Sequence, residues 1–466
     1  MGWRRARVGA AVVVGVLLAG LASGVPAQAR AAVVNVACTE ADLRTAIANS
    51  NAGTGDTLIL ASYCPYVLTD AGGGALPQII QPLEIQGNNA TIKRDTSASD
   101  FRIFDVGAVS LTMDTLTVMN GNAGSGNPGG GVFLGTSGGS LATTNVHFQG
   151  NTAQDGGAIE AESGTSISLS GGTISDNRAT GFGGGLFTTG TVSVALDSVI
   201  VTRNRTENSG GGLFLSTDQP AVITGGAIRN NTAKAAGGGI FFVSGGSLTV
   251  DGTAITDNRV TASVEGGGGV LFLAADADAS VALTDSTVSG NYVTGFVNDG
   301  LGNRGGGIRT LGSMTLDNTT VANNQLVGAF GQGAGIAAED SEGAATTLTL
   351  QNGTTVTGNV ASGRYSQGGG LYADTNINPT TVSVTDSGID TNKVTGTGSA
   401  AAGVYNDGAT FSFTNSSVDT NIAPSAPAPG GVYTTVAIAA VVGSTFTANF
   451  PTNCVFSPQP VTGCIG

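Results

Sequence analysis

A short run of glycines followed by apolar residues recurs along most of the chain. The stretch GGGIFFV (237–243) is one copy, and related copies such as GGGVFL, GGAI and GGGLY lie before and after it. In five successive copies the first apolar residue stands at positions 132, 159, 186, 213 and 240, so neighbouring copies are 27 residues apart. A regular period of roughly 20–50 residues is typical of a solenoid or another repeat array.

An asparagine keeps pace with the glycine run. Each repeat carries an apolar residue, two further residues and then asparagine, as in Phe148…Asn151 and Ile255…Asn258. We expect this asparagine at a corner of the coil, because asparagine tolerates the left-handed backbone region. Stacked asparagine side chains could also hydrogen-bond to one another along the solenoid.

A single repeat, residues 237–262, indicates the fold. It contains three strand-like runs, GIFFV, SLTV and AITDN, which glycine and polar clusters separate, and it has no helical periodicity. We therefore predict an all-β chain that forms a right-handed parallel β-helix, with three short strands in each of roughly eleven or twelve coils. The glycines would turn a corner where positive φ and close backbone contact exclude a side chain. The apolar residue after them would then point into the core.

The N-terminus has the features of a secretory signal. The cationic segment WRRAR precedes an apolar stretch (8–22), and small residues offer cleavage sites after Ala29 or Ala31. A retained membrane anchor is the alternative, but the apolar stretch is short for a spanning helix. We expect an extracellular protein, secreted or associated with the cell surface, monomeric and without a membrane span after signal removal. The predicted regions are a signal peptide (1–31), an N-terminal cap (32–75), the β-helix (76–450) and a C-terminal cap (451–466).

Four cysteines remain after the signal, Cys38, Cys64, Cys454 and Cys464. An even number in an exported protein indicates disulfides, and three pairings are possible. Pairing Cys38 with Cys64 and Cys454 with Cys464 would place one disulfide at each end of the repeats. A metal site is the alternative, but the chain has one histidine and no CxxC motif. We assign no metal site and no cofactor.

The ends of a solenoid need covers, because a terminal coil exposes its core and an unpaired sheet edge. Thr39 and Asp42 fit a helix-start capping box, and Leu43 and Ile47 lie on one face of the helix they would begin. We predict a short amphipathic helix over residues 39–50 on the first coil. The last residues, from 451, would form the opposite cap.

The sequence resembles a known group of repeat proteins. The pairing of FQGN (148–151) with GGAI (156–159) is similar to the repeats of chlamydial-type polymorphic outer membrane proteins. The segment CTEADLRTAIANSNAGTGDTLILA (38–61) resembles the CSLREA-type element that precedes such β-helices in secreted bacterial proteins. It departs from the name-giving letters but keeps the cysteine, the Leu-Arg pair and the later Gly-Asp-Thr. The resemblance implies a pectin-lyase-like fold and an extracellular or surface setting.

The charged residues argue against two classes of function. Eighteen Lys and Arg against 32 Asp and Glu make nucleic acid an unlikely partner, since its binding requires a basic face. Hydrolysis of a glycoside requires two placed carboxylates, but the chain lacks an Asp-Asp pair, a His-Gly and an Arg-x-Lys. We assign no catalytic residue. The two acid clusters in insertions between strands are interpreted as solvated loop tips that could bind Ca²⁺ weakly: Asp276 with Asp278, and Glu339 with Asp340 and Glu342.

Aromatic residues mark the candidate ligand-binding surface. If the residue after each glycine corner points inward, the next one points outward, and that outward position is often aromatic. An exposed aromatic strip could stack on sugar rings or contact another protein. The alternative is that the rings stack on one another or lie beneath loops. The longest loop, within 292–307, supplies a second candidate group. The candidates are Phe187, Phe214, Phe241, Tyr372, Tyr405 and Tyr433 on the strip and Tyr292, Phe296 and Arg304 in the loop.

Two functions remain open from the sequence. The first is a secreted, non-catalytic, adhesin-like scaffold that binds polysaccharide or protein through its side surface. The second is a polysaccharide lyase or glycoside hydrolase with acids from the 265–345 loops. Turnover that is lost in Asp276→Ala or Asp340→Ala would favour the enzyme. For the scaffold, we expect Tyr372→Ala with Tyr405→Ala to weaken ligand retention and to leave the melting temperature nearly unchanged.

Overall fold

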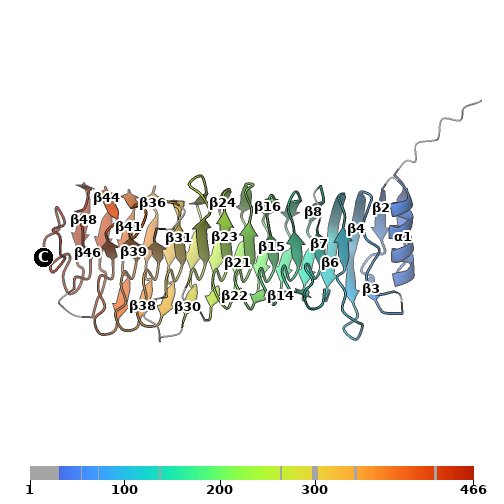
Figure 1. Cartoon of the computed structure of the whole chain (residues 1–466), viewed down its shortest axis with the longest axis horizontal. Helices are drawn as coiled ribbons and strands as arrows, with labels where there is room; N and C mark the ends of the chain where they lie inside the picture. Colours follow the sequence, from blue (N-terminus) through green and yellow to red (C-terminus); the bar gives the residue numbers. More distant parts are fainter. Residues whose placement is uncertain are drawn as a thin grey trace, which may run out of the picture. The chain divides into compact units, whose positions relative to one another are not determined.

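The computed structural model describes residues 31–466 except 54, 72, 136–137, 263–264, 296–302, 341–343 and 425–427. The predicted signal peptide therefore lies outside the described residues, apart from Ala31. The described residues form one helix, α1 (Glu40–Ala52), and strands β1 to β48. The strands belong to three parallel sheets of 27, 9 and 12 strands, and those of the 12-stranded sheet, from β5 (Phe104–Val106) to β46 (Val432–Thr434), follow one another in sequence order (Figure 1).

One coil shows how the chain winds. Strand β11 (Ile159–Ala161) lies in the 12-stranded sheet, β12 (Ser166–Ser170) and β13 (Thr173–Ser175) in the 27-stranded sheet, and β14 (Arg178–Ala179) in the 9-stranded sheet. The next coil begins with β15 (Leu186–Thr188), which pairs in parallel with β11. The predicted right-handed parallel β-helix is confirmed, and its 12-stranded sheet agrees with the expected number of coils. This coil has a fourth strand, β14, in addition to the three that the sequence predicted. It follows the asparagine and was not predicted, because a strand of two residues is too short to show periodicity.

The apolar residue after each glycine run lies in the core, as predicted. All eleven of these side chains are fully buried and stack from coil to coil. Such burial is the main favourable contribution to the stability of the coils. The eleven are Val132, Ile159, Leu186, Leu213, Ile240, Val270, Ile308, Ile336, Leu371, Val404 and Val432.

The glycine run at 237–239 shows why this corner excludes side chains. Gly237 has φ +57°, in the left-handed region that glycine adopts most easily. A Cβ atom on Gly238 would lie 2.4 Å from the carbonyl oxygen of Gly268 in the next coil. One on Gly239 would lie 2.6 Å from the carbonyl oxygen of Gly269. The first glycine makes the turn, and the other two allow adjacent coils to approach.

The asparagines form the predicted hydrogen-bonded ladder. Asn258 Oδ1 accepts hydrogen bonds from the backbone N–H and the side-chain Nδ2 of Asn231, both at 3.0 Å. Asn258 Nδ2 donates to the carbonyl oxygen of Ile228 at 2.8 Å. The expected left-handed conformation is instead adopted by the preceding residue, Asp257, with φ +56°. That residue turns the corner, and the buried asparagine holds adjacent coils together.

The N-terminal cap contains the predicted helix and disulfide. Helix α1 begins after Thr39, whose Oγ1 accepts a hydrogen bond from the backbone N–H of Asp42, and it buries Leu43 and Ile47. It runs to Ala52, two residues beyond the predicted end. The Cys38–Cys64 disulfide joins the residue before Thr39 to the chain after β2 (Asp56–Leu60).

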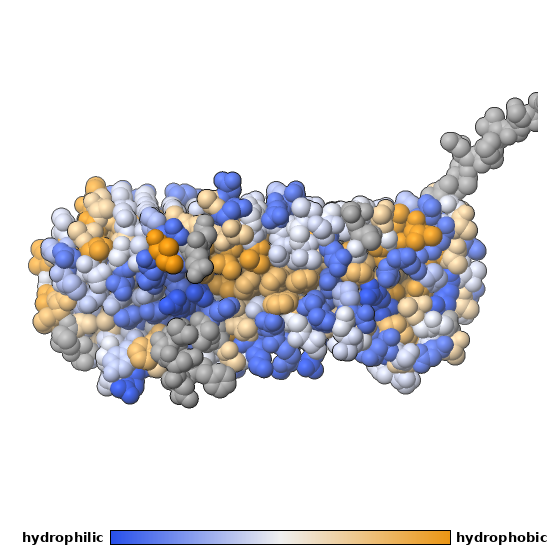
Figure 2. All heavy atoms as spheres, in the orientation of Figure 1, coloured by the Kyte–Doolittle hydropathy of each residue, from blue (hydrophilic) through white to orange (hydrophobic). Residues whose placement is uncertain are grey.

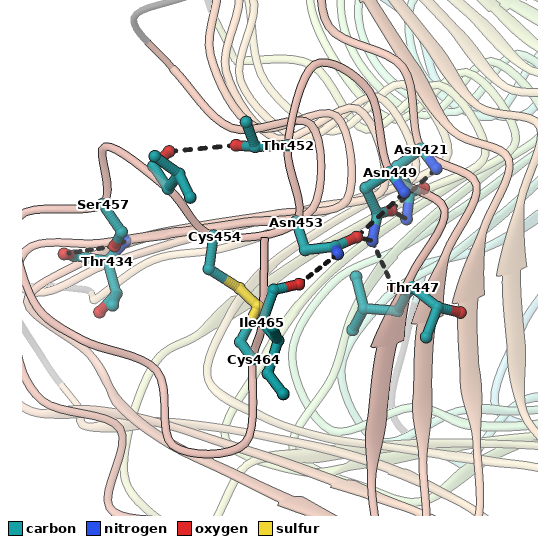
Figure 3. Close-up of a disulfide and its surroundings, with 12 residues drawn as sticks. Asn421, Thr434, Thr447, Asn449, Thr452, Asn453, Cys454, Ser457, Cys464 and Ile465 are labelled. Atoms are coloured by element: carbon teal, nitrogen blue, oxygen red, sulfur yellow. Dashed lines mark hydrogen bonds between the residues drawn. A yellow bond between two sulfur atoms is a disulfide. The ribbon is translucent and has the colours of Figure 1, made fainter.

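The C-terminal cap ends the asparagine ladder with a local substitute. Asn453 Oδ1 accepts hydrogen bonds from the backbone N–H and Nδ2 of Asn449, as the asparagine of a further coil would (Figure 3). Asn453 Nδ2 donates to the carbonyl oxygen of Ile465 at 2.7 Å, and the Cys454–Cys464 disulfide closes this segment. Both predicted disulfides are therefore confirmed.

Candidate functional site

Four of the six candidate residues of the aromatic strip are buried, and the other two, Phe187 and Tyr433, are half-buried. Phe214, Phe241, Tyr372 and Tyr405 are only 9%, 8%, 3% and 8% exposed, so the expectation of an open strip is wrong. Figure 2 shows apolar residues gathered over β15 and β23 (Ile240–Ser244), but the rings there are packed against one another. Ligand binding by these residues remains a prediction.

The rings form two stacked clusters along the 12-stranded sheet. The ring centroids of Phe214 and Phe241 are 4.8 Å apart with planes 4° from parallel. Phe187 extends this cluster, and Phe182 and Ala236, from the segments before the glycine runs, pack against it. In the second cluster, Tyr405 stacks between Tyr372 and Tyr433 and packs with Ala400 and Ala401. Stacking of the rings on one another is the alternative that the sequence leaves open, and the structure favours it.

The covered rings reverse the expectation for the tyrosine variants. Tyr405→Ala should lower the free energy of unfolding by about 2–4 kcal/mol, because it removes a buried ring that packs against two others. Thermal unfolding followed by circular dichroism measures this loss. Tyr405→Phe, which keeps the ring, should cost less than about 1 kcal/mol. If Tyr405→Ala leaves the melting temperature unchanged, the ring does not stabilise the fold, and the prediction of an exposed ring that binds a ligand would be favoured again.

The second candidate group is divided. Phe296 and Glu342 lie outside the described residues. Tyr292 lies under the guanidinium of Arg259, whose Cζ is 4.9 Å from the ring centroid. Arg304 is bound in an ion pair with Glu339.

The first acid cluster lies where the sequence predicted. Asp276 and Asp278 are exposed, as expected of a loop tip.

The structure brings Arg304 and Tyr372 together with three residues from neighbouring coils. We call Arg304, Arg309, Glu339, Tyr372 and Asp374 the buried charge cluster. Its strands are β31 (Ile308–Leu311), β35 (Ile336–Ala338) and β39 (Leu371–Asp374) in the 12-stranded sheet. Since β35 and β39 pair in register up to their ends, the carboxylate that follows β35 and the one that ends β39 occupy equivalent positions of adjacent coils.

Glu339 is the anionic centre of this cluster. Its Oε2 accepts hydrogen bonds from Arg304 Nη1 at 3.0 Å and from Arg309 Nε at 2.9 Å. The residue is 2% exposed, so the interpretation as a solvated loop tip is wrong. The small side chain of Ala337, which pairs with Arg309 on one side and Tyr372 on the other, leaves room for the arginines.

Asp340, the next residue, faces a different segment. Its carboxylate accepts hydrogen bonds from the backbone N–H groups of Asn376, Ile377 and Asn378. Partial burial opposes ionisation of this carboxyl, but these donors outweigh it and hold its pKa below the usual range. Asp340 therefore fixes a loop in its ionised form and lacks the raised pKa of a general acid.

Asp374 is the carboxyl group of the cluster whose pKa is raised. It is 6% exposed, and its Oδ2 accepts a hydrogen bond from the Tyr372 hydroxyl at 3.2 Å, while Oδ1 has no hydrogen-bond partner. Burial and then the charge of Glu339 raise the pKa of Asp374 to about 6, although Arg304 acts in the opposite direction. The proximity of Glu339 and Asp374 could not be predicted from the sequence, because 35 residues and a variable insertion separate them.

The raised pKa makes stability depend on pH. The pKa of Asp374 is about 6 in the folded state, against a usual value of 3.8. Between pH 3.8 and about pH 6 the folded state therefore binds the proton more tightly than the unfolded state does. The free energy of unfolding falls as the pH rises through this range. At about 1.4 kcal/mol per pH unit, ionised Asp374 costs about 2–3 kcal/mol. Asp374→Asn should therefore raise the melting temperature at pH 8, and the gain should shrink toward zero at pH 4.

Asp407→Asn is the matched control for that experiment. Asp407 pairs with Asp374 in the next coil, but it is exposed. Its substitution should change the melting temperature little at either pH. Equal effects of the two substitutions would show that burial of Asp374 carries no cost.

The cluster contains two carboxyl groups, as an acid–base pair requires, but neither is exposed to a substrate. Two carboxylates with different environments are typical of general acid–base sites. Here both are buried, and one is held by two arginines. Among the described residues, no three His, Cys, Asp or Glu side chains gather as metal ligands would. In the same part of the chain, no helix is both long and apolar enough to span a bilayer.

Comparison with known proteins supports the fold. The family model for the right-handed beta helix region matches residues 107–282, which contain the most regular coils. No match was found among the curated proteins or among the solved structures.

Proposed function

We propose that the chain is a secreted or cell-surface, non-catalytic, adhesin-like scaffold that binds polysaccharide through its side surface. The two disulfides support an oxidising, extracellular setting. The pectin-lyase-like β-helix supplies long, rigid, repetitive side faces. Because four of the six candidate rings are buried, we place the binding surface elsewhere on these faces.

The observation that carries the proposal is a surface of aligned hydroxyl groups. Strands β36 (Thr346–Gln351), β40 (Thr380–Thr385) and β44 (Thr410–Thr414) alternate buried, mostly apolar residues with outward residues that are mostly Thr and Ser. The outward residues pair in register across the three coils. We call this set the hydroxyl surface: Thr347, Thr349, Thr381, Ser383, Thr410 and Ser412.

Such a surface suits a polymer of neutral sugars. Its hydroxyls both donate and accept hydrogen bonds, and they recur at the strand spacing of about 4.8 Å. A rigid sheet also fixes them before binding, so little conformational entropy is lost when a polymer docks. A polysaccharide could thus make many weak, repeated contacts.

A carbohydrate-active enzyme is the second candidate. The raised pKa of Asp374 beside Glu339 favours it, because an acid that keeps its proton near pH 6 could protonate a leaving oxygen. The burial of both carboxylates weighs against it. Incubation with polysaccharides, followed by assays for new reducing ends and for unsaturated products, distinguishes the two. Turnover that Asp374→Asn abolishes would replace the scaffold with an enzyme.

Retention on insoluble polysaccharides tests the scaffold. The purified chain should be depleted from solution by at least one of cellulose, mannan, xylan and chitin. Thr347→Glu with Thr410→Glu should reduce that retention at least tenfold, because two carboxylates interrupt the hydroxyl surface. The control, Thr152→Glu with Thr232→Glu, adds the same charges at half-buried threonines of the 9-stranded sheet. Equal losses in both pairs, or no retention of the unaltered chain, would contradict the proposal.

A further inference from the structure

A polar groove lies beside the hydroxyl surface. It has a volume of 420 Å³ and follows the bend at which β36 passes to β37 (Thr355–Thr357), β40 to β41 (Gly388–Asp390), and β44 to β45 (Ser417–Asp419). Small-molecule sites are commonly about 300–1,000 Å³ in volume. The groove therefore has room for a ligand that is larger than water or an ion.

A missing side chain at Gly388 leaves a gap in the lining of this groove. Gly388 pairs with Thr355 in one neighbouring coil and with Ser417 in the other, and both neighbours present outward hydroxyls. A Cβ atom on Gly388 would lie 2.5 Å from Asp390 Oδ2 and 3.3 Å from Ser417 Oγ. The gap in the row of side chains is thus partly occupied by the Asp390 carboxylate.

The Asp390 carboxylate has one engaged oxygen and one that faces the gap. Oδ1 accepts hydrogen bonds from Ser417 Oγ at 3.2 Å and from the backbone N–H of Asp419 at 3.1 Å. Oδ2 lies over Gly388. These bonds fix the orientation of the carboxylate, so its second oxygen is held ready as an acceptor.

The remaining lining gives the groove its charge. Asp386, which is exposed, supplies a second carboxylate, and its Oδ1 accepts a hydrogen bond from Asn415 Nδ2 at 3.2 Å. The described lining has no lysine or arginine. Two carboxylates would repel a uronic acid or another anion, whereas they accept hydrogen bonds from the hydroxyls of a neutral sugar.

We propose that this groove binds one or two residues of a neutral saccharide, with sugar hydroxyls donating to Asp390 and Asp386 and accepting from the serine and threonine side chains. The inference rests on the proposed function and names its ligand class. The groove would fix the position of a chain that the hydroxyl surface holds more loosely. It also distinguishes neutral polysaccharides from polyuronates, which the acidic lining rejects.

Isothermal titration with defined oligosaccharides tests the groove. The probes are cellohexaose, mannohexaose, xylohexaose and hexagalacturonate, with CaCl₂ alone as a fifth titrant. At least one neutral hexasaccharide should bind the unaltered chain. Gly388→Thr, which fills the gap with the side chain found at residue 355, should weaken that binding at least tenfold. Asp390→Asn should also weaken it, and hexagalacturonate should not bind.

Ala254→Thr is the matched control. Ala254 holds the position of Gly388 in the strand row of an earlier coil, where it pairs with Ala227 and Thr287, so the same side chain is added away from the groove. Thermal unfolding of each variant confirms that the coils remain folded. The control should bind the hexasaccharide as the unaltered chain does.

The outcomes separate the groove from the proposed function. Hexasaccharide binding that survives both Gly388→Thr and Asp390→Asn would overturn the groove and leave the scaffold intact. Failure of every hexasaccharide to bind, together with no retention on polysaccharides, would overturn both. Binding of hexagalacturonate, or of Ca²⁺ alone in a manner that Asp390→Asn abolishes while sugars are unaffected, would overturn the neutral-sugar assignment.

Discussion

Replacing Asn258 with alanine should lower the free energy of unfolding by about 3–5 kcal/mol, because one fully buried amide makes four hydrogen bonds between coils. Without it, the backbone N–H and Nδ2 of Asn231 lose their acceptor, and the carbonyl oxygen of Ile228 and Oδ1 of Asn291 each lose a donor. A buried polar group without a partner costs about 1–3 kcal/mol. Alanine offers neither donor nor acceptor, and the space is closed to bulk water.

Denaturant unfolding and amide hydrogen exchange measure this effect. Exchange is the sharper method for a solenoid, because coils contact only their neighbours and can open locally. Amides of residues 228–232 should exchange faster in Asn258→Ala, whereas those of α1 should be unaffected. Asn49→Ala, at an exposed position of α1, is the control and should be neutral or slightly stabilising, since alanine is the better helix former. Equal stability of the two variants would show that the ladder contributes little.

The features that the sequence predicted depend on the repeat itself. The inward position of Ile240 follows from its place after three glycines, and the hydrogen bonds of Asn258 follow from its recurrence once per coil. Both are set by local backbone conformation and by the period. The disulfides follow similarly, because Cys454 and Cys464 are close in sequence and lie beyond the last coil.

The features that the sequence did not predict depend on which segments of the chain cover a face of the β-helix. Phe214 points away from the core, as expected, but Phe182 and Ala236 pack against it. The repeat period does not predict where these two residues lie. From the sequence, Glu339 is interpreted as a loop residue. Only the register between β35 and β39 shows that it lies at the position equivalent to Asp374. Gly388 stands outside any glycine run, so its gap becomes visible only when its neighbouring coils are aligned.

Glu339→Gln should lower the free energy of unfolding by about 3 kcal/mol, because it leaves two partly buried guanidinium groups without their counter-ion. The carboxylate is 2% exposed, so water cannot replace it. Glutamine keeps the shape of the side chain, and the loss can therefore be attributed to charge. Chemical denaturation of the purified chain measures it.

Glu207→Gln provides the matched control. Glu207 also pairs with two arginines, Arg178 at 3.0 Å and Arg205 at 3.3 Å, but their side chains are 55% and 62% exposed. Exposed pairs of this kind contribute about 0–1 kcal/mol, so this substitution should have little effect. Comparable losses in Glu207→Gln and Glu339→Gln would mean that burial does not strengthen the inner pair.

The Glu339 charge also couples to Asp374. Because that charge raises the pKa of Asp374, Glu339→Gln should lower this pKa from about 6, which carboxyl carbon shifts in an NMR titration report. Arg309→Gln should cost less in the Glu339→Gln background than in the unaltered chain, since the arginine there has already lost its partner. An unchanged Asp374 titration together with additive costs would contradict the assignment of Glu339 as the shared counter-ion of the cluster.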